Sequence, residues 1–183
     1  MKKYLITSPE FYTDNSEVFA QKLEEQIKKH QPDFVLLRDK QTLHYKVLAA
    51  VFMQVMKKHP IIKAFIHDDI ELTVALNATG VHLPSYSFDK IKEATRKNLE
   101  VIVSTHSKEE VLNAQKLNAN YVTYSPIFFT PNKGEPKGIQ ELTELLESTN
   151  INIFALGGIV KEQEVALIQK SKAYGFASIR YFY

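Results

Sequence analysis

Two basic residues follow a short apolar run in the order FVLL, then RDK. Because they stand two positions apart at the end of a predicted strand, Arg38 and Lys40 point to the same side. A guanidinium offers a planar fork of donors and an ammonium adds a point charge, a combination that suits an anion such as pyrophosphate. The alternative is a solvated turn. The spacing predicts an anion site if other elements converge on it.

A glycine pair near the end of the chain predicts a second anion site. Gly157 and Gly158 lie in the motif ALGGI ahead of a predicted helix, and Gly175–Ser178 (GFAS) forms the next apolar run. Glycine lets a ligand approach the backbone, and N–H groups at the start of a helix attract phosphate. A glycine pair is also an ordinary strand-to-helix turn. Its position before the last strand favours the phosphate interpretation.

Further polar residues follow the other apolar runs. Asp68 and Asp69 could ligate Mg²⁺ through hard carboxylate oxygens, or one of them could cap the next helix. Three histidines at run ends leave a transition-metal site with Asp68 as an alternative, although their spacing matches no standard zinc motif. The polar residues at run ends also include His67, His82, Ser85, Ser104, Thr105, His106, Thr130, Asn132, Lys133 and Ser178.

The elements that must position these residues alternate regularly. Short runs rich in β-branched and aromatic residues recur, and most are continuously apolar, as buried parallel strands are. These predicted strands are Lys3–Thr7, Phe34–Leu37, Ile61–Ile66, Gly80–Leu83, Val101–Val103, Tyr121–Tyr124, Ile151–Ala155 and Gly175–Ala177. The pattern predicts eight strands with a helix in each interval.

Amphipathic segments fill those intervals. Val18, Phe19, Leu23 and Ile27 share one helical face, and a wider apolar stripe runs over Leu43–Met56. Further helices are predicted over Ile70–Leu76, Phe88–Arg96, Lys108–Leu117, Ile139–Leu146 and Glu162–Gln169. Strict alternation implies parallel strands. Eight units favour the α/β class and a closed (β/α)₈ TIM barrel over an open doubly wound sheet.

The chain ends soon after the eighth predicted strand. Ser178–Tyr183 is too short for a full eighth helix, so we expect that helix to be short or absent. An apolar groove would then need a cover. Either a homodimer or the aromatic tail Tyr181–Tyr183 is expected to supply it. The irregular stretch Ser125–Gly138 after the sixth strand is typical of a functional lid.

Composition limits the class of protein. With 44% hydrophobic and 24% charged residues, the chain is typical of a soluble globular protein, and we expect a single domain over residues 1–183. The formal net charge is +2 and the basic residues are scattered, so no nucleic-acid or membrane partner is expected. The absence of cysteine excludes disulfides and a cysteine nucleophile. A cytoplasmic location is expected.

Several motifs together resemble one family, the thiamin phosphate synthases and their TenI relatives. LLRDK (Leu36–Lys40) resembles Q-L-R-x-K, and HDDIELTVALNATGVHL (His67–Leu83) resembles N-D-D…A-D-G-V-H-L. STHS (Ser104–Ser107) is similar to G-x-S-T-H-S, and NANYVTYSPIFFTPNKG (Asn118–Gly134) to G-A-D-Y-V-x-x-G-P-I-F-P-T-x-T-K. ALGGI resembles A-I-G-G-I. The motifs cover nearly the whole chain in the family's order and spacing.

The resemblance implies a (β/α)₈ barrel that acts in thiamin biosynthesis. A hydroxymethylpyrimidine pyrophosphate loses pyrophosphate, and the nitrogen of a thiazole phosphate attacks the resulting cation. By position, the implied catalytic ligands of pyrophosphate are Arg38, Lys40, Ser104 and Lys133. The implied substrate-binding residues are His67, His82, Thr130, Gly157, Gly158, Ala177 and Ser178. Asp68 is the implied ligand of Mg²⁺, the expected cofactor, and the expected partners are small phosphorylated ligands.

The chain departs from the family pattern at particular positions. Leu36 stands where synthases have glutamine, His67 where they have asparagine, and Ser87 where an aspartate would complete the Mg²⁺ site. Either Asp89 supplies that carboxylate from two residues later, or the Mg²⁺ site is incomplete. The TenI branch is a thiazole tautomerase with a catalytic histidine at the position of Pro126. Synthase chemistry is the leading hypothesis, and a tautomerase or a non-catalytic paralogue that binds phosphate ligands are the alternatives.

Overall fold

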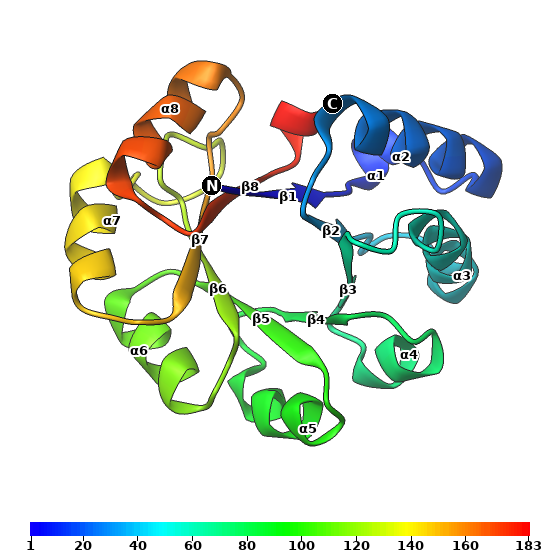
Figure 1. Ribbon diagram of the computed structural model, residues 1–183, viewed down its shortest axis with the longest axis horizontal. Coiled ribbons are helices and arrows are strands. Elements are labelled where there is room, and N and C mark those ends of the chain that lie inside the picture. Colours follow the sequence, from blue (N-terminus) through cyan, green and yellow to red (C-terminus); the bar gives the residue numbers. More distant parts are fainter.

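The computed structural model describes residues 1–183 and contains a closed barrel of eight parallel strands. The strands follow chain order, and the ring closes where β1 pairs with β8 (Figure 1). The strands are β1 Lys2–Ile6, β2 Phe34–Leu37, β3 Lys63–His67, β4 Gly80–Leu83, β5 Glu100–Thr105, β6 Tyr121–Tyr124, β7 Asn152–Leu156 and β8 Gly175–Ser178. The predicted TIM barrel is confirmed.

Helices surround the barrel, one in each interval between strands. The main ones are α2 Ser16–His30, α3 Tyr45–Met56, α4 Ile70–Ala75, α5 Ile91–Arg96, α6 Lys108–Lys116, α7 Gly138–Glu147 and α8 Glu162–Ser171. The shorter ones are α1 Pro9–Tyr12 and the 3₁₀ turns η1 Phe88–Lys90 and η2 Arg180–Phe182. Side chains of Asn15, Asp69 and Ser107 accept backbone N–H bonds at the starts of α2, α4 and α6. None of the helices has the length and apolar character needed to cross a membrane.

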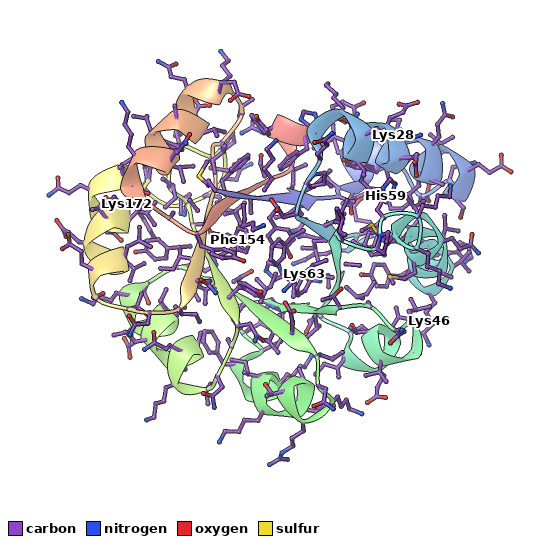
Figure 2. The ribbon with its side chains drawn as sticks, viewed as in Figure 1. Lys28, Lys46, His59, Lys63, Phe154 and Lys172 are labelled. Carbon is purple, nitrogen blue, oxygen red and sulfur yellow. The ribbon has the colours of Figure 1, made fainter.

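Alternating strand residues divide the core into two parts. Inward-pointing side chains form a small cluster that includes Tyr4, Phe34, Phe65 and Phe154, and outward-pointing ones join the larger cluster beneath the helices. Figure 2 shows Phe154 within the ring of strands. The interior is thus filled with side chains, and an open space can form only at the ends of the strands.

The third strand begins later than its apolar pattern predicts. The run was expected to start at Ile61, but a turn in which Ile62 N–H donates to the His59 carbonyl at 3.0 Å leaves Ile61 93% exposed. The strand starts at Lys63 and extends to His67. Turn geometry therefore overrode the hydrophobic pattern at this boundary.

The aromatic tail fills the place where a full helix would follow β8. Phe182 of η2 is fully buried, and its ring stacks on Phe176 at 5.6 Å. The ring of Tyr183 lies 4.3 Å from that of Phe11, and the Tyr181 hydroxyl donates to Glu162. In Figure 1 this segment sits between α8 and α2. The tail supplies the expected cover, and dimerisation stays a prediction.

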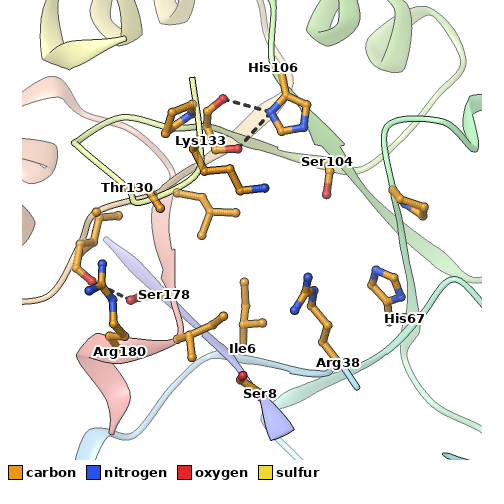
Figure 3. Close-up of a pocket in the computed structure, with 18 of the residues that line it drawn as sticks. Ile6, Ser8, Arg38, His67, Ser104, His106, Thr130, Lys133, Ser178 and Arg180 are labelled. Atoms are coloured by element: carbon orange, nitrogen blue, oxygen red, sulfur yellow. Dashed lines mark hydrogen bonds between the residues drawn. The ribbon is translucent and has the colours of Figure 1, made fainter. Parts of the chain in front are cut away.

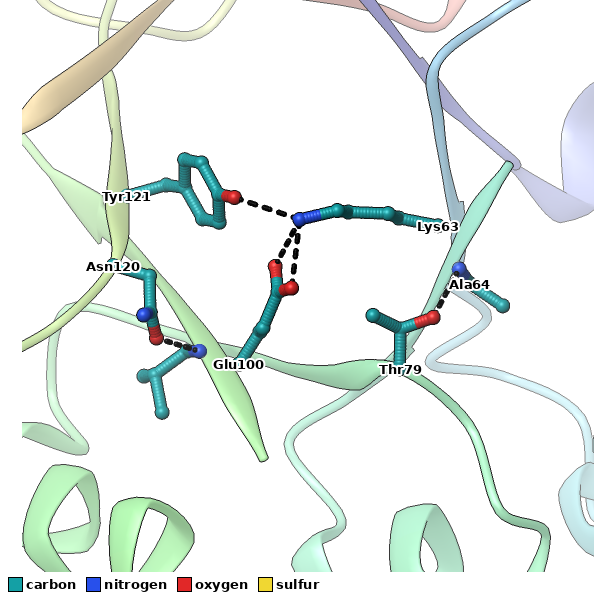
Figure 4. A network of polar contacts seen from close by, with 7 residues as sticks. Lys63, Ala64, Thr79, Glu100, Asn120 and Tyr121 are labelled. Carbon is teal, nitrogen blue, oxygen red and sulfur yellow. Dashed lines mark hydrogen bonds and ion pairs between the residues drawn. The ribbon is translucent and has the colours of Figure 1, made fainter. Parts of the chain in front are cut away.

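The amino-terminal end of the barrel is tied together by paired charges. The Lys63 ammonium donates to both carboxylate oxygens of Glu100, at 2.7 and 2.9 Å, and to the Tyr121 hydroxyl at 3.0 Å (Figure 4). Nearby, Lys2 pairs with Asp33 at 2.7 Å. The contacts of Lys63 join β3, β5 and β6 across the barrel end. Both lysines are paired with a residue of opposite charge.

Candidate active site

A cavity of about 470 Å³ opens at the carboxyl ends of the strands, within the size range of small-ligand sites. It is lined by the loops that follow almost every strand, as the closed parallel topology requires (Figure 3). The sequence-predicted residues that line it are Arg38, Lys40, His67, Ser85, Ser104, His106, Thr130, Lys133, Gly157, Gly158 and Ser178. Residues far apart in the sequence thus meet in one site.

Positive charge without partners dominates this cavity. Arg38, Lys40, Lys133 and Arg180 line it, and none of them forms an ion pair within the chain. Glu10 is the one acidic residue in the lining. Burial lowers the pKa of Arg38. Burial, and then the charges of Arg38 and Lys133, lower the pKa of Lys40. Cations held together against their mutual repulsion indicate an anionic ligand.

A buried hydrogen-bond chain leads from the barrel core to the cavity. The Tyr4 hydroxyl lies 2.8 Å from His82 Nδ1, and His82 Nε2 lies 2.9 Å from Ser104 Oγ. Burial holds the pKa of His82 well below its usual value of 6.5, so the imidazole is neutral. Nδ1 is the one hydrogen-bond partner of the Tyr4 hydroxyl, so the hydroxyl donates its proton to Nδ1. Since Nδ1 is then an acceptor, we assign the ring proton of the neutral imidazole to Nε2. Ser104 then accepts from His82 and keeps its own proton for a ligand.

The glycine pair forms a cradle against the facing loop. Gly157 and Gly158 have φ angles of +101° and +69°, which other residues rarely adopt. A Cβ atom on Gly158 would lie 2.6 Å from the Phe129 carbonyl oxygen, and one on Gly157 would lie 2.8 Å from Pro126 Cα. No hydrogen bond within the chain uses the N–H of either glycine. Free amides in this geometry suit a phosphate.

Two predicted binding residues lie beneath the cavity and do not line it. His82 is 3% exposed and reaches the cavity only through Ser104. Ala177 is fully buried in the inner cluster. Next to it, Ser178 lines the cavity, and its hydroxyl donates to the Ile159 carbonyl at 2.7 Å. This bond ties the end of β8 to the loop after β7.

The sequence analysis missed several lining residues, above all Arg180 and Glu10. Arg180 begins η2, one residue before the predicted covering tail Tyr181–Tyr183, and its side chain lies near Ser178 in Figure 3. Its position two residues after the last strand was the available signal. Glu10 belongs to α1, a helical turn of four residues with no amphipathic pattern to reveal it. The other missed residues include Ser8, Phe11 and Tyr86.

The surroundings of Asp68 do not fit a divalent cation. Its carboxylate pairs with the Lys90 ammonium at 2.9 Å, and Asp68 is absent from the cavity lining. Asp69 caps α4 through a 2.9 Å bond from Leu72 N–H. Asp89 is exposed and contributes no contact to Asp68. No group of three or more His, Cys, Asp or Glu side chains is placed to hold a metal ion.

Fold and site together define a class: a closed TIM barrel whose strand ends carry a cation-lined cavity and a glycine cradle for phosphate. The particular family follows from comparison with known proteins. A family model described as thiamine monophosphate synthase matches residues 3–182. The chain belongs to this family, as its motifs predicted.

Individual relatives agree with the family model. The chain is 34% identical over 184 residues to a protein of Aquifex aeolicus named "Putative thiamine-phosphate synthase 2", covering 98% of this chain and 96% of that one. It is also 34% identical to a thiamine-phosphate synthase of Clostridium novyi, covering 91% and 83%. A solved structure, thiamine phosphate pyrophosphorylase from Pyrococcus furiosus, matches with a TM-score of 0.82 at 23% identity, covering 97% and 85%. This last likeness shows the fold.

Proposed function

We propose that this protein is a thiamin phosphate synthase, which joins hydroxymethylpyrimidine pyrophosphate to thiazole phosphate and releases pyrophosphate. Family membership and the names of the relatives support the proposal. The observation that carries it is the set of unpaired cations in a cavity that also holds the glycine cradle. One substrate brings a pyrophosphate and the other a phosphate, so the reaction needs two anion subsites in one space.

A cytoplasmic location belongs to the same proposal, because a chain without cysteine suits a reducing compartment.

The bonds that break and form in this reaction define a role for the cations that line the cavity. The bond between the pyrimidine methylene carbon and the pyrophosphate oxygen breaks, and its electron pair leaves with pyrophosphate. The thiazole ring nitrogen then donates its lone pair to the methylene carbon. Arg38, Lys40 and Lys133 stabilise the charge that grows on the leaving group, and the Ser104 hydroxyl donates a further hydrogen bond. These contacts strengthen as the bond breaks.

The other side of the cavity positions the thiazole. The amides of Gly157 and Gly158 bind its phosphate, and Arg180 adds a charge from the loop after β8. Thr130 lies beside Gly157: a Cβ atom added to Gly157 would lie 3.2 Å from the Thr130 hydroxyl oxygen. Holding the phosphate in this cradle fixes the ring nitrogen relative to the methylene carbon, which lowers the entropic barrier to attack.

His67 is proposed to contact the pyrimidine ring from the third strand. Burial, together with the charges of Arg38 and Lys40, lowers the pKa of His67 to about 4, so its imidazole is neutral at pH 7. A neutral imidazole offers one donor and one acceptor, as an aminopyrimidine edge requires. Leu36 is 1% exposed in the inner cluster and is absent from the lining. His67 therefore takes over polar recognition that Leu36 cannot supply.

A tautomerase has less support at its decisive position. Pro126 lines the cavity and carries no acid or base group.

The test of the synthase proposal is an assay of the purified protein with both synthase substrates, in which thiamin phosphate and pyrophosphate are quantified together. Equimolar formation of both, absent when either substrate is omitted, is expected. No product under any condition, with tight binding of thiazole phosphate retained, would favour the non-catalytic paralogue.

A further inference from the structure

Asp68 is held by a set of donors from the segment after β4. Its Oδ1 accepts from the Lys90 ammonium at 2.9 Å and from the Ser87 hydroxyl at 3.3 Å, and its Oδ2 lies 3.5 Å from the Tyr86 hydroxyl. Ser87 is 2% exposed, whereas the side chains of Asp68 and Lys90 are partly exposed. The donors meet the carboxylate on both oxygens. A metal ion would have to displace the ammonium to reach it.

The backbone reinforces this arrangement. Asp68 has a φ angle of +52°, a left-handed conformation that is uncommon outside glycine, and its N–H donates to the His82 carbonyl at 3.0 Å. Asp68 directly precedes Asp69, the N-cap of α4, and Lys90 ends the η1 turn. The two residues of the ion pair therefore come from the segments that follow β3 and β4.

The ion pair borders the cavity. Tyr86, whose hydroxyl lies 3.5 Å from Asp68 Oδ2, lines the cavity, and so does His67, which precedes Asp68 in the chain. The charge of Asp68 also acts on Lys40: it raises the pKa of that ammonium, in opposition to burial and to the neighbouring cations. Together Asp68 and Lys90 contribute no net charge. The field that a bound anion meets is therefore set by Arg38, Lys40 and Lys133.

We propose that Lys90 serves as a built-in counter-ion in place of a divalent metal, so that the cavity binds pyrophosphate with protein cations alone. This inference rests on the proposed function, since it concerns the leaving group of that reaction. In this account Lys90 is a positioning residue. It neutralises Asp68, which would otherwise repel the anion held by Arg38, Lys40 and Lys133.

Calorimetric titration of the wild-type protein with inorganic pyrophosphate tests the proposal, once in excess EDTA and once in excess Mg²⁺. We expect binding in EDTA, with an affinity within about threefold of that in Mg²⁺. Binding that appears only with Mg²⁺, or strengthens more than about tenfold, would overturn the inference and leave the proposed function standing. Absence of binding under both conditions would overturn both.

Variants of the ion pair identify its role. Lys90→Met frees the Asp68 carboxylate, so pyrophosphate affinity in EDTA should fall at least about tenfold and recover in Mg²⁺. Mn²⁺ binding, followed by its electron paramagnetic resonance signal, should appear in this variant and strengthen when Ser87→Asp is added. The double variant Asp68→Asn/Lys90→Met removes both charges and should bind as the wild type does in EDTA.

The matched control is Lys97→Met, which breaks the 3.0 Å pair with Glu71, and neither residue lines the cavity. It should bind pyrophosphate as the wild type does. If Lys90→Met behaves like Lys97→Met, Lys90 has no role in anion binding and the inference is wrong. If Lys90→Met fails to fold, the double variant decides: wild-type affinity in EDTA supports the inference, and a requirement for Mg²⁺ contradicts it.

Discussion

The two ends of the barrel use lysine in opposite ways. At the amino-terminal end, Lys63 is bound by Glu100 and Tyr121, and its charge is balanced within the chain. At the carboxyl-terminal end, Lys133 and Arg38 face a cavity without an acidic partner. A paired charge joins strands, whereas an unpaired charge needs a ligand to balance it. The difference separates an end that stabilises the fold from an end that binds substrate.

Removing unpaired charge should have the largest effect. Lys133→Ala and Arg38→Ala each remove a cation that stabilises departing pyrophosphate, a loss that typically costs about 2–4 kcal/mol, or roughly 30- to 1,000-fold in turnover. Steady-state kinetics with both substrates measure the effect. The KM for thiazole phosphate should change far less than kcat. A raised KM for the pyrimidine pyrophosphate with kcat unchanged would mean that these cations bind the ground state as strongly as the transition state.

The glycine cradle gives the next largest effect. In Gly158→Ala, a Cβ would lie 2.6 Å from the Phe129 carbonyl oxygen at a φ of +69°, so the loop must shift and the amides move away from the phosphate. Affinity for thiazole phosphate should fall at least about tenfold by calorimetry. Gly134→Ala is the control, because a Cβ there meets nothing within 4 Å. Similar affinities in the two variants would place the phosphate elsewhere.

The buried histidine beneath the cavity predicts a dependence of stability on pH. Because burial holds the pKa of His82 well below 6.5, the folded protein excludes a proton that the unfolded chain binds. The free energy of unfolding should therefore fall as pH decreases below about 6.5. His82→Gln should reduce the slope by up to about 1.4 kcal/mol per pH unit in denaturant titrations. Tyr4→Phe removes the hydrogen bond but keeps the imidazole, so it should keep the wild-type slope.

The smallest effect is expected at the paired end. Lys63→Met breaks bonds to partly exposed groups, so the free energy of unfolding should fall by about 1 kcal/mol, discounted for solvent screening. Turnover should stay within about twofold of the wild type, because Lys63 lies at the far end of the barrel. Thermal unfolding and the synthase assay together check this. A large loss of turnover without loss of stability would erase the distinction between the ends.

Much of this arrangement was predictable from sequence, because strand periodicity alone orders the residues around a barrel. Their positions after the predicted strands, together with the family resemblance, made Arg38, Lys133 and the glycine pair candidate anion-binding residues, and all of them line the cavity. Periodicity does not reveal which charges are paired. Lys90 was not singled out because its partner Asp68 lies 22 residues away, and the contact depends on a left-handed backbone. Arg180 was missed because the fold of the tail depends on the packing of Phe182.

The most direct test is a crystal structure of the protein with pyrophosphate and thiazole phosphate bound together. The account predicts pyrophosphate among Arg38, Lys40 and Lys133, and the thiazole phosphate on the amides of Gly157 and Gly158, with the thiazole ring between them. Anomalous scattering from the thiazole sulfur would fix the orientation of that ligand. Either anion bound outside this cavity, or both competing for one subsite, would contradict it.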